Sequence, residues 1–259
     1  MALKENSQER LLRLLSLFAD EEKGEWSVDE ASVHLGISAS QTYRYFRTLA
    51  SAGYISAYTT GRYVLGPAII ELDRKLRIGD PMIHAARSIM REMLSTAPSA
   101  SIAILCRYFR GQVMCVHEEF ETYQHHEISY ERGQPRPLYQ GAASKVILAN
   151  LPLRQARAYF NHAPDKFNQF DLGANWTEVK RSLRELRSQP AIITAGELGT
   201  SASGISAPIY DDKRVLGSVS LVLPITVATE EVTSFLMPVV AAAGQEMTRK
   251  MQHLAQLQQ

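Results

Sequence analysis

The sequence has 259 residues, enough for two domains with a sizeable core in at least one of them. Apolar residues make up 45% and charged residues 21%, which is typical of a globular protein, and the formal net charge of +1 excludes the binding of polyanions by bulk charge alone. The first six residues lack the apolar core of a signal peptide, Pro238 interrupts the apolar stretch 235–243, and two cysteines cannot form a disulfide framework, so we expect a cytoplasmic protein without a membrane segment.

Charge is unevenly placed along the first seventy residues. Residues 1–30 carry eight acidic side chains against four basic ones, whereas residues 31–70 carry no acidic side chain and three arginines, Arg44, Arg47 and Arg62. A polyanion that approached residues 31–70 would meet attraction without local opposition. Three arginines in forty residues are ordinary, so the pattern of the elements has to decide what this charge means.

Three helices are predicted in the first fifty residues. The first begins at Ser7 and has apolar side chains at the spacing of one buried face, at Leu11, Leu14, Leu15 and Phe18. A capping box over residues 27–30 starts the second helix, which ends at Gly36, and another over residues 38–41 starts the third. Two helices joined by so short a turn, with glycine at its corner, are typical of a helix-turn-helix.

The third predicted helix presents a polar face that contains no acidic residue. In a helix-turn-helix, the first residues of the second helix meet base edges in the major groove, where Arg44 can contact a guanine and Gln41 an adenine. Ser38, Ser40 and the helix N-terminus are better suited to a phosphate. Packing would bury Thr42, Tyr45, Phe46 and Leu49, which leaves an outward set of Ser40, Gln41, Tyr43, Arg44 and Arg47.

A hairpin follows the third helix. Residues 54–58 and 62–65 are β-prone, and residues 59–61 (Thr-Thr-Gly) supply the turn between them. Such a hairpin would be a wing, with Arg62 at its tip for contact with backbone phosphate or a minor groove. A small helical protein-binding module is the alternative for this region, but the coincidence of caps, turn, basic face and wing favours DNA binding.

A connecting helix with apolar residues Ile69, Leu72 and Leu76 ends at Gly79, and Asp80-Pro81 is typical of an N-cap followed by proline at the first helical position. We therefore expect a DNA-binding domain over residues 1–79, linker helix included, and a second domain over residues 80–259. After an amphipathic helix over residues 83–94, the second domain alternates strands near 101–108, 112–118, 125–130, 191–194, 203–210 and 214–223 with helices near 142–150, 152–160, 176–188 and 229–257.

Three groups of residues resemble the IclR family of bacterial transcription regulators, and together they span essentially the entire chain. The family's winged helix-turn-helix is similar to residues 35–38, 48–55 and 62–66. Its ligand-domain motif is similar to Gly133, residues 137–138 and residues 142–149, with Ser144 in place of the usual glycine. Its C-terminal signature is similar to residues 196–197, 206–211 and 215–220 with Pro224.

The resemblance implies an α+β fold in which the winged helix-turn-helix is joined by a linker helix to a GAF-like α/β effector-binding domain. It also implies operator DNA as a partner, a small organic or aromatic acid as effector, and a homodimer or a dimer of dimers. The family's pocket residues fall on Ala142, Ala143, Thr194, Gly204, Ser220 and Val222.

Members of the family that bind very small keto acids usually have Asp, Cys and a second Ser where Thr194, Gly204 and Val222 stand here. We therefore expect a less polar, roomier pocket and a larger, partly apolar carboxylate such as an aromatic acid. Arg107, or a neutral histidine such as His126, lies on a predicted strand and is a candidate for contact with that carboxylate.

The sequence contains no convincing catalytic or metal-binding motif. Residues 199–204 are one residue too long for the nucleophile elbow, Ser144-Lys145 lacks the spacing of S-x-x-K, and no phosphate-binding loop or dinucleotide motif occurs. Residues 117–119 and 125–126 form the one imidazole cluster, without the spacing of zinc ligands. We therefore expect no enzyme, metal or cofactor, although a GAF-like enzyme with a DNA-binding appendage and a DNA-binding scaffold stay open as alternatives.

The two cysteines give a further alternative. With a two-residue turn at Arg110-Gly111, Cys106 faces Cys115 in a non-hydrogen-bonded pair, close enough to oxidise. A redox-sensing regulator is therefore an alternative to one that binds an effector. Our main hypothesis is a repressor or activator of a catabolic operon, in which the effector prefers one arrangement of the DNA-binding heads and so changes their affinity for DNA.

Overall fold

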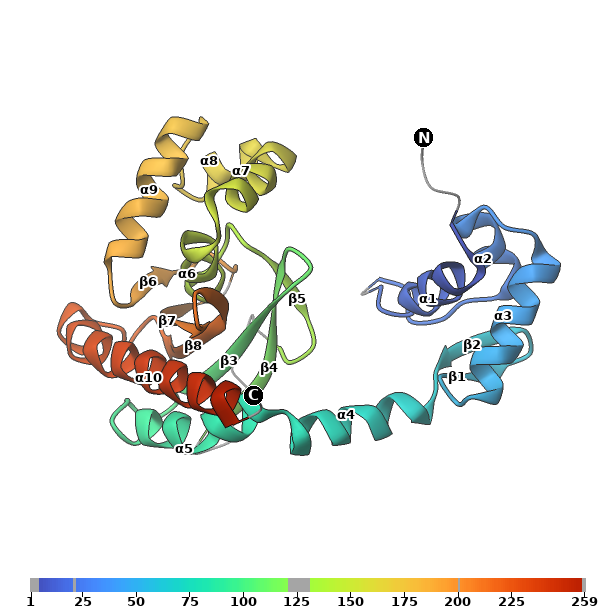
Figure 1. The fold of residues 1–259 in the computed structure, drawn as a ribbon, viewed down its shortest axis with the longest axis horizontal. Helices are drawn as coiled ribbons and strands as arrows, with labels where there is room; N and C mark the ends of the chain where they lie inside the picture. The colour runs from blue at the N-terminus through green and yellow to red at the C-terminus, as the bar shows by residue number, and fades with distance from the viewer. Residues whose placement is uncertain (1–4, 21, 121–130, 200, 258–259) are drawn as a thin grey trace. The chain divides into compact units, whose positions relative to one another are not determined.

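The computed structural model describes residues 5–20, 22–120, 131–199 and 201–257 (Figure 1). Contacts divide the chain into two units, residues 1–78 and 79–259, and each has its own core. The fold is α+β, as the sequence predicts. Over the described residues, every helix falls short of the combined length and apolar character that a membrane span requires.

The first unit has the elements of the predicted winged helix-turn-helix. Three helices are followed by an antiparallel hairpin that turns at residues 60–61, and a fourth helix comes after the hairpin. The elements are α1 (Ser7–Leu17), α2 (Val28–Leu35), α3 (Ala39–Ser51), β1 (Ile55–Thr59), β2 (Arg62–Leu65) and α4 (Pro67–Gly79).

Local hydrogen bonds start and end these helices. Ser27 and Glu30 form the predicted capping box of α2, and Gly36 ends that helix with a left-handed φ of 66°. Ser38 caps α3 by accepting from the Gln41 N–H at 3.4 Å. The second capping box is only half formed, however, because the Gln41 side chain bonds to the Tyr45 hydroxyl instead of reaching back to the Ser38 N–H.

One core joins the three helices and the hairpin. Leu14, Phe46 and Ile55 are fully buried in it, and the buried face of α3 is the predicted one. Trp26 makes an unpredicted contribution, because its backbone N–H donates to the Tyr63 carbonyl and its carbonyl accepts from the Tyr63 N–H, both at 3.0 Å. This exchange ties the segment before α2 to the wing.

The described part of the second unit is built on a six-stranded antiparallel sheet in the order β5-β4-β3-β8-β7-β6. Its strands are β3 (Ile102–Phe109), β4 (Gln112–Phe120), β5 (Pro135–Pro137), β6 (Ile192–Ala195), β7 (Ala202–Asp211) and β8 (Arg214–Pro224). Its helices are α5 (Pro81–Ser95), α6 (Ala142–Asn150), α7 (Leu153–His162), α8 (Pro164–Gln169), α9 (Trp176–Ser188) and α10 (Glu230–Leu257).

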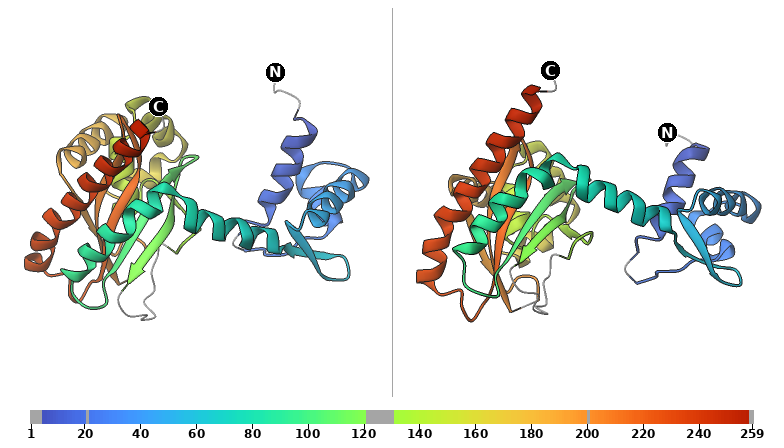
Figure 2. Two further views of the ribbon diagram at one scale, coloured as in Figure 1. Left: turned by 60° about the horizontal axis from the view of Figure 1, so that its bottom comes forward. Right: turned by 90° about the horizontal axis from the view of Figure 1, so that it is seen from below.

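Helices cover both faces of this sheet. Helices α5 and α10 lie on one face, and α6 to α9 lie on the other (Figure 2). Because side chains alternate along a strand, Leu105 of β3 packs with α5 and α10, whereas Ile104 and Cys106 pack with α6. Helix α10 continues through Pro238.

Most elements of the second unit lie close to their predicted positions, and Asn175 caps α9 as predicted. The sequence did not predict β5, which is three residues long with proline at both ends, or α8, which has only six residues. The predicted strand at 125–130 lies outside the described residues.

Candidate functional site

The outward face of α3 carries most of the residues predicted to contact DNA. Ser38, Ser40, Tyr43, Arg44 and Arg47 are all exposed. Among the described residues, none forms an ion pair with Arg44 or Arg47. The two guanidinium groups are therefore available to an external partner.

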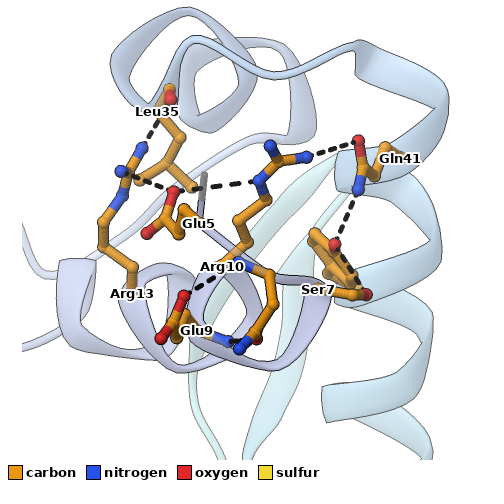
Figure 3. A network of polar contacts seen from close by, with 9 residues as sticks. Glu5, Ser7, Glu9, Arg10, Arg13, Leu35 and Gln41 are labelled. Atoms are coloured by element: carbon orange, nitrogen blue, oxygen red, sulfur yellow. Dashed lines mark hydrogen bonds and ion pairs between the residues drawn. The ribbon is translucent and has the colours of Figure 1, made fainter. Parts of the chain in front are cut away.

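Gln41 differs from the prediction, because its amide group is engaged inside the unit (Figure 3). Its Nε2 donates to the Tyr45 hydroxyl at 2.7 Å, and its Oε1 accepts from Arg10 Nη1 at 3.5 Å. The Tyr45 hydroxyl lies 3.0 Å from Ser7 Oγ, so this chain of contacts joins α3 to α1. Helical spacing predicts which way Gln41 points from α3. It does not predict its contact with α1, because Arg10 lies 31 residues before Gln41 in the sequence.

Arg62 also differs from the prediction. It stands at the start of β2 beside the turn, but its Nη1 lies 2.8 Å from Glu30 Oε2 and 3.7 Å from Glu25 Oε1. The backbone N–H of Ser27, its hydroxyl, Lys23 and Arg62 together lower the pKa of Glu30 to about 2 against some opposition from burial. Arg62 therefore ties the wing to the start of α2, and Tyr58 is an exposed aromatic side chain near the tip.

The six residues that the family resemblance assigns to an effector pocket line a single cavity in the second unit. It lies between the start of α6, Ile104 of β3 and the strands β6, β7 and β8. Ser206 and Ser220 share a hydrogen bond of 2.7 Å in its wall, and Ser218 holds α6 on β8 by donating to the Ala143 carbonyl at 3.1 Å. The six are Ala142, Ala143, Thr194, Gly204, Ser220 and Val222.

The cavity is smaller than the sequence predicts. Its volume is about 30 Å³, which is room for one or two water molecules. Residues 196–198, which follow β6, are part of its lining. The roomier pocket that we expected from Thr194, Gly204 and Val222 is therefore not present.

An ion pair between a buried lysine and a partly exposed glutamate adjoins this cavity, and apart from the motifs of the resemblance no sequence pattern predicts it. Lys145 of α6 places its Nζ 2.5 Å from Glu197 Oε1 and donates to the Phe170 carbonyl at 2.9 Å. Glu197, which lines the cavity, accepts from the Gly141 N–H at 2.8 Å with its other oxygen. A carboxylate thus occupies the positive N-terminal end of α6.

Arg107 is not part of the cavity. Its guanidinium lies on Asp80, with Nη1 2.9 Å from Oδ2, and it projects from the sheet face opposite to the one that carries Ile104. The alternation of side chains along β3 explains the difference. His126 lies outside the described residues, and among those described no group of three potential ligands could hold a metal ion.

Cys106 and Cys115 face each other across β3 and β4, as the predicted turn at Arg110-Gly111 requires. Both thiols are free and fully buried, and burial raises the pKa of Cys106 well above its ordinary value. A buried thiol with a raised pKa forms little of the reactive thiolate. The geometry permits a disulfide, but the environment disfavours the chemistry.

Comparison with known proteins gives matches along nearly the whole chain. Residues 7–57 match the "IclR helix-turn-helix domain", and residues 80–249 match "Bacterial transcriptional regulator IclR C-terminal". The HTH-type transcriptional regulator KipR of Bacillus subtilis is 23% identical over 255 residues, which cover 96% of this chain and 98% of KipR.

Solved structures of similar fold include an IclR transcriptional regulator from Silicibacter sp. TM1040, with a TM-score of 0.79, 18% identity and coverage of 95% of this chain and 96% of that one. An IclR homolog from Microbacterium hydrocarbonoxydans, complexed with 4-hydroxybenzoate, has a TM-score of 0.69, 14% identity and coverage of 96% and 100%. Since the matched families account for both units, the chain belongs to the IclR family of bacterial transcriptional regulators.

Proposed function

We propose that this chain is a cytoplasmic, effector-responsive regulator of a catabolic operon, in which residues 1–79 bind the operator and residues 80–259 bind a small carboxylate. One observation carries the proposal: six residues from four separate elements line one cavity at the start of α6. The helix N-terminus and the serine pair in the cavity wall are suited to the carboxylate, and Ile104, Leu198 and Val222 to an apolar body.

A partly apolar acid of the aromatic class is the effector that this lining favours. The Microbacterium relative, complexed with 4-hydroxybenzoate, supports this choice. A cavity of about 30 Å³ is too small for a benzene ring, so binding must enlarge it. We assign this enlargement to a displacement of residues 196–198, which line the cavity and follow the short edge strand β6.

For DNA, we assign base contact to Arg44, Arg47 and Tyr43 on the exposed face of α3, and phosphate contact to Ser38 and Ser40 at its start. Gln41 would have to leave Tyr45 and Arg10 before it could reach an adenine, so we assign it a structural part. We likewise assign Arg62 to positioning the wing.

A homodimer would supply the two reading heads that a pseudo-palindromic operator needs. Helix α4 has no buried residue, and two apolar side chains one turn apart, Leu72 and Leu76, are 52% and 45% exposed on one face. A second copy of the same helix would cover such a stripe. The effector would then act by favouring one arrangement of the two heads, and only to the extent of its differential affinity.

The test uses the purified full chain and an operator selected by it from a pool of random duplexes. Calorimetry with benzoate, 4-hydroxybenzoate, pyruvate and glyoxylate ranks the acids, and the best of them is added to a gel-shift assay. We expect an aromatic acid to bind best and to change the affinity for the operator, with the acid recovered unaltered. Tighter binding of glyoxylate would refute the size argument, and conversion of the acid would favour an enzyme.

A further inference from the structure

We propose that Glu197 is a built-in competitor of the effector: its carboxylate occupies the anion position formed by Lys145 and the start of α6, and the effector's carboxylate replaces it on binding. This inference rests on the proposed function, because it assumes that a carboxylate enters the cavity that Glu197 lines. It adds a step that the cavity alone does not specify, namely which group must leave.

The contacts of Glu197 are those that a carboxylate ligand would use. One oxygen lies 2.5 Å from Lys145 Nζ, and the other accepts from the Gly141 N–H at 2.8 Å. The N-cap residue of α6, Gly141, has no side chain to cap the helix, and Glu197 accepts from its N–H instead, 56 positions further along the chain. A cation combined with helix N–H groups is a general carboxylate site.

Lys145 makes this more than a helix N-terminus. Its side chain is only 7% exposed, it packs in the second turn of α6, and its Nζ is also held by the Phe170 carbonyl. Among the described residues, Glu197 is the anionic partner of Lys145, and a buried ammonium that loses such a partner is strongly destabilising. The position is therefore favoured with an anion in it, either Glu197 or a carboxylate that enters in its place, and the form with the position vacated is a minor one.

The position of Glu197 links this exchange to the size of the cavity. Its side chain is 20% exposed, so it can turn out to water, whereas Lys145 cannot follow. Glu197 and the adjacent Leu198 both line the cavity, and the Gln140 amide ties the Glu197 carbonyl to the loop before α6. Release of the carboxylate would free residues 196–198 to move and so enlarge a cavity that is now about 30 Å³.

Two consequences follow for recognition. The measured affinity of the effector includes the free energy of displacing Glu197, because the competent form with the position vacated is a minor one. A neutral analogue of the effector cannot replace the charge opposite Lys145, so it gains nothing from the exchange. Glu197 thereby makes the pocket selective for acids over their amides.

The test measures the binding of benzoate, 4-hydroxybenzoate and benzamide to the full chain by calorimetry. For Glu197→Gln, which removes the competing charge but keeps an amide oxygen for Gly141, we expect the two acids to bind about tenfold to a hundredfold more tightly, the factor of a hydrogen bond to a charged group. Benzamide should bind equally weakly to both proteins. Glu185→Gln removes the same charge from an exposed residue of α9 and should leave every affinity unchanged.

Two further variants test the same exchange of carboxylates. Glu197→Asp retains the charge on a shorter side chain and should give a smaller gain in affinity for the acids. It provides the measurement if Glu197→Gln folds poorly. Lys145→Gln/Glu197→Gln lacks both charges and should show no gain over the wild type, because the acid then has no cation to meet.

The outcomes separate the inference from the function on which it rests. Acids that bind the wild type but bind Glu197→Gln and Glu197→Asp no more tightly would overturn the role of Glu197 and leave the effector cavity standing. If the acids bind neither the wild type nor any variant, both the role of Glu197 and the proposed effector cavity are overturned. A gain that extends equally to benzamide would also refute the exchange, since it would show a loosened pocket without selection by charge.

Discussion

Asp80 and Arg107 form a two-point ion pair, in which Arg107 Nη1 lies 2.9 Å from Asp80 Oδ2 and Nη2 lies 3.0 Å from Oδ1. The same carboxylate accepts from the N–H groups of Met82 and Ile83 at the start of α5. One buried side chain thus fixes the beginning of α5 on strand β3, at the first residues of the effector-binding unit.

Asp80→Asn should separate these two contributions, because asparagine can still cap a helix but cannot pair with Arg107. We expect a loss of about 2 kcal/mol in the free energy of unfolding, below the range for a fully buried pair because Arg107 is partly exposed. Asp80→Ala should cost about 1 kcal/mol more through loss of the cap. Urea denaturation monitored by circular dichroism measures both, and equal stability of Asp80→Asn and the wild type would mean that the pair contributes nothing.

Arg44→Ala should weaken operator binding by about 1–3 kcal/mol, the discrimination of one bidentate base contact. The reason is that Arg44 is exposed on α3 with no ion pair to any described residue, so its guanidinium can form a fork on a guanine. Fluorescence anisotropy with the operator and with a random duplex measures the difference, with Arg184→Ala on α9 as a matched control. An equal loss on both duplexes would contradict base reading by Arg44.

Gln41→Ala is expected to behave differently. Its amide joins Arg10 and Tyr45 in the contact between α1 and α3, so the substitution should lower the stability of the first unit by about 1 kcal/mol. Affinity for operator and random duplexes should then fall together or not at all. Thermal unfolding with the same anisotropy assay tests this, and a loss confined to the operator would restore Gln41 as a base reader.

Local sequence patterns predicted the structural features that depend only on residues close together in the sequence. The capping box of Ser27 and Glu30 and the turn at Gly36 each involve only a few consecutive residues. The pairing of Cys106 with Cys115 follows from the two-residue turn between their strands. In each case the sequence distance is short enough for spacing alone to fix the geometry.

Side-chain partners that lie far apart in the sequence could not be predicted in this way. Glu197 reaches Lys145 across 52 positions, and Arg62 reaches Glu30 across 32, so spacing carries no information about either pair. The same limit explains Arg107: the alternation of strand β3 shows that it shares a face with Leu105, but not which face meets the cavity.

The low pKa of Glu30 predicts how the first unit responds to acid. Because the Ser27 backbone N–H, assisted by Ser27 Oγ, Lys23 and Arg62, lowers this pKa from 4.5 to about 2, the ionised form is favoured in the folded state. Its stabilising effect is fully present above pH 4.5 and is lost as the pH falls towards 2. Urea denaturation of Glu30→Gln and the wild type should therefore differ near pH 6 and converge near pH 2, and a constant difference at all pH values would contradict this assignment.

Gly204→Val should make the protein insensitive to its effector while leaving DNA binding intact. Gly204 lies in strand β7 with an ordinary φ, so a β-branched residue is compatible with the backbone there. A Cβ at this position would lie 3.6 Å from the Ala142 Cβ, an ordinary contact, and the two further methyl groups would fill the cavity between them. Calorimetry with 4-hydroxybenzoate should show no binding, and the operator affinity measured by anisotropy should equal that of the wild type. Binding of the acid with unchanged affinity would place the effector elsewhere in the second unit.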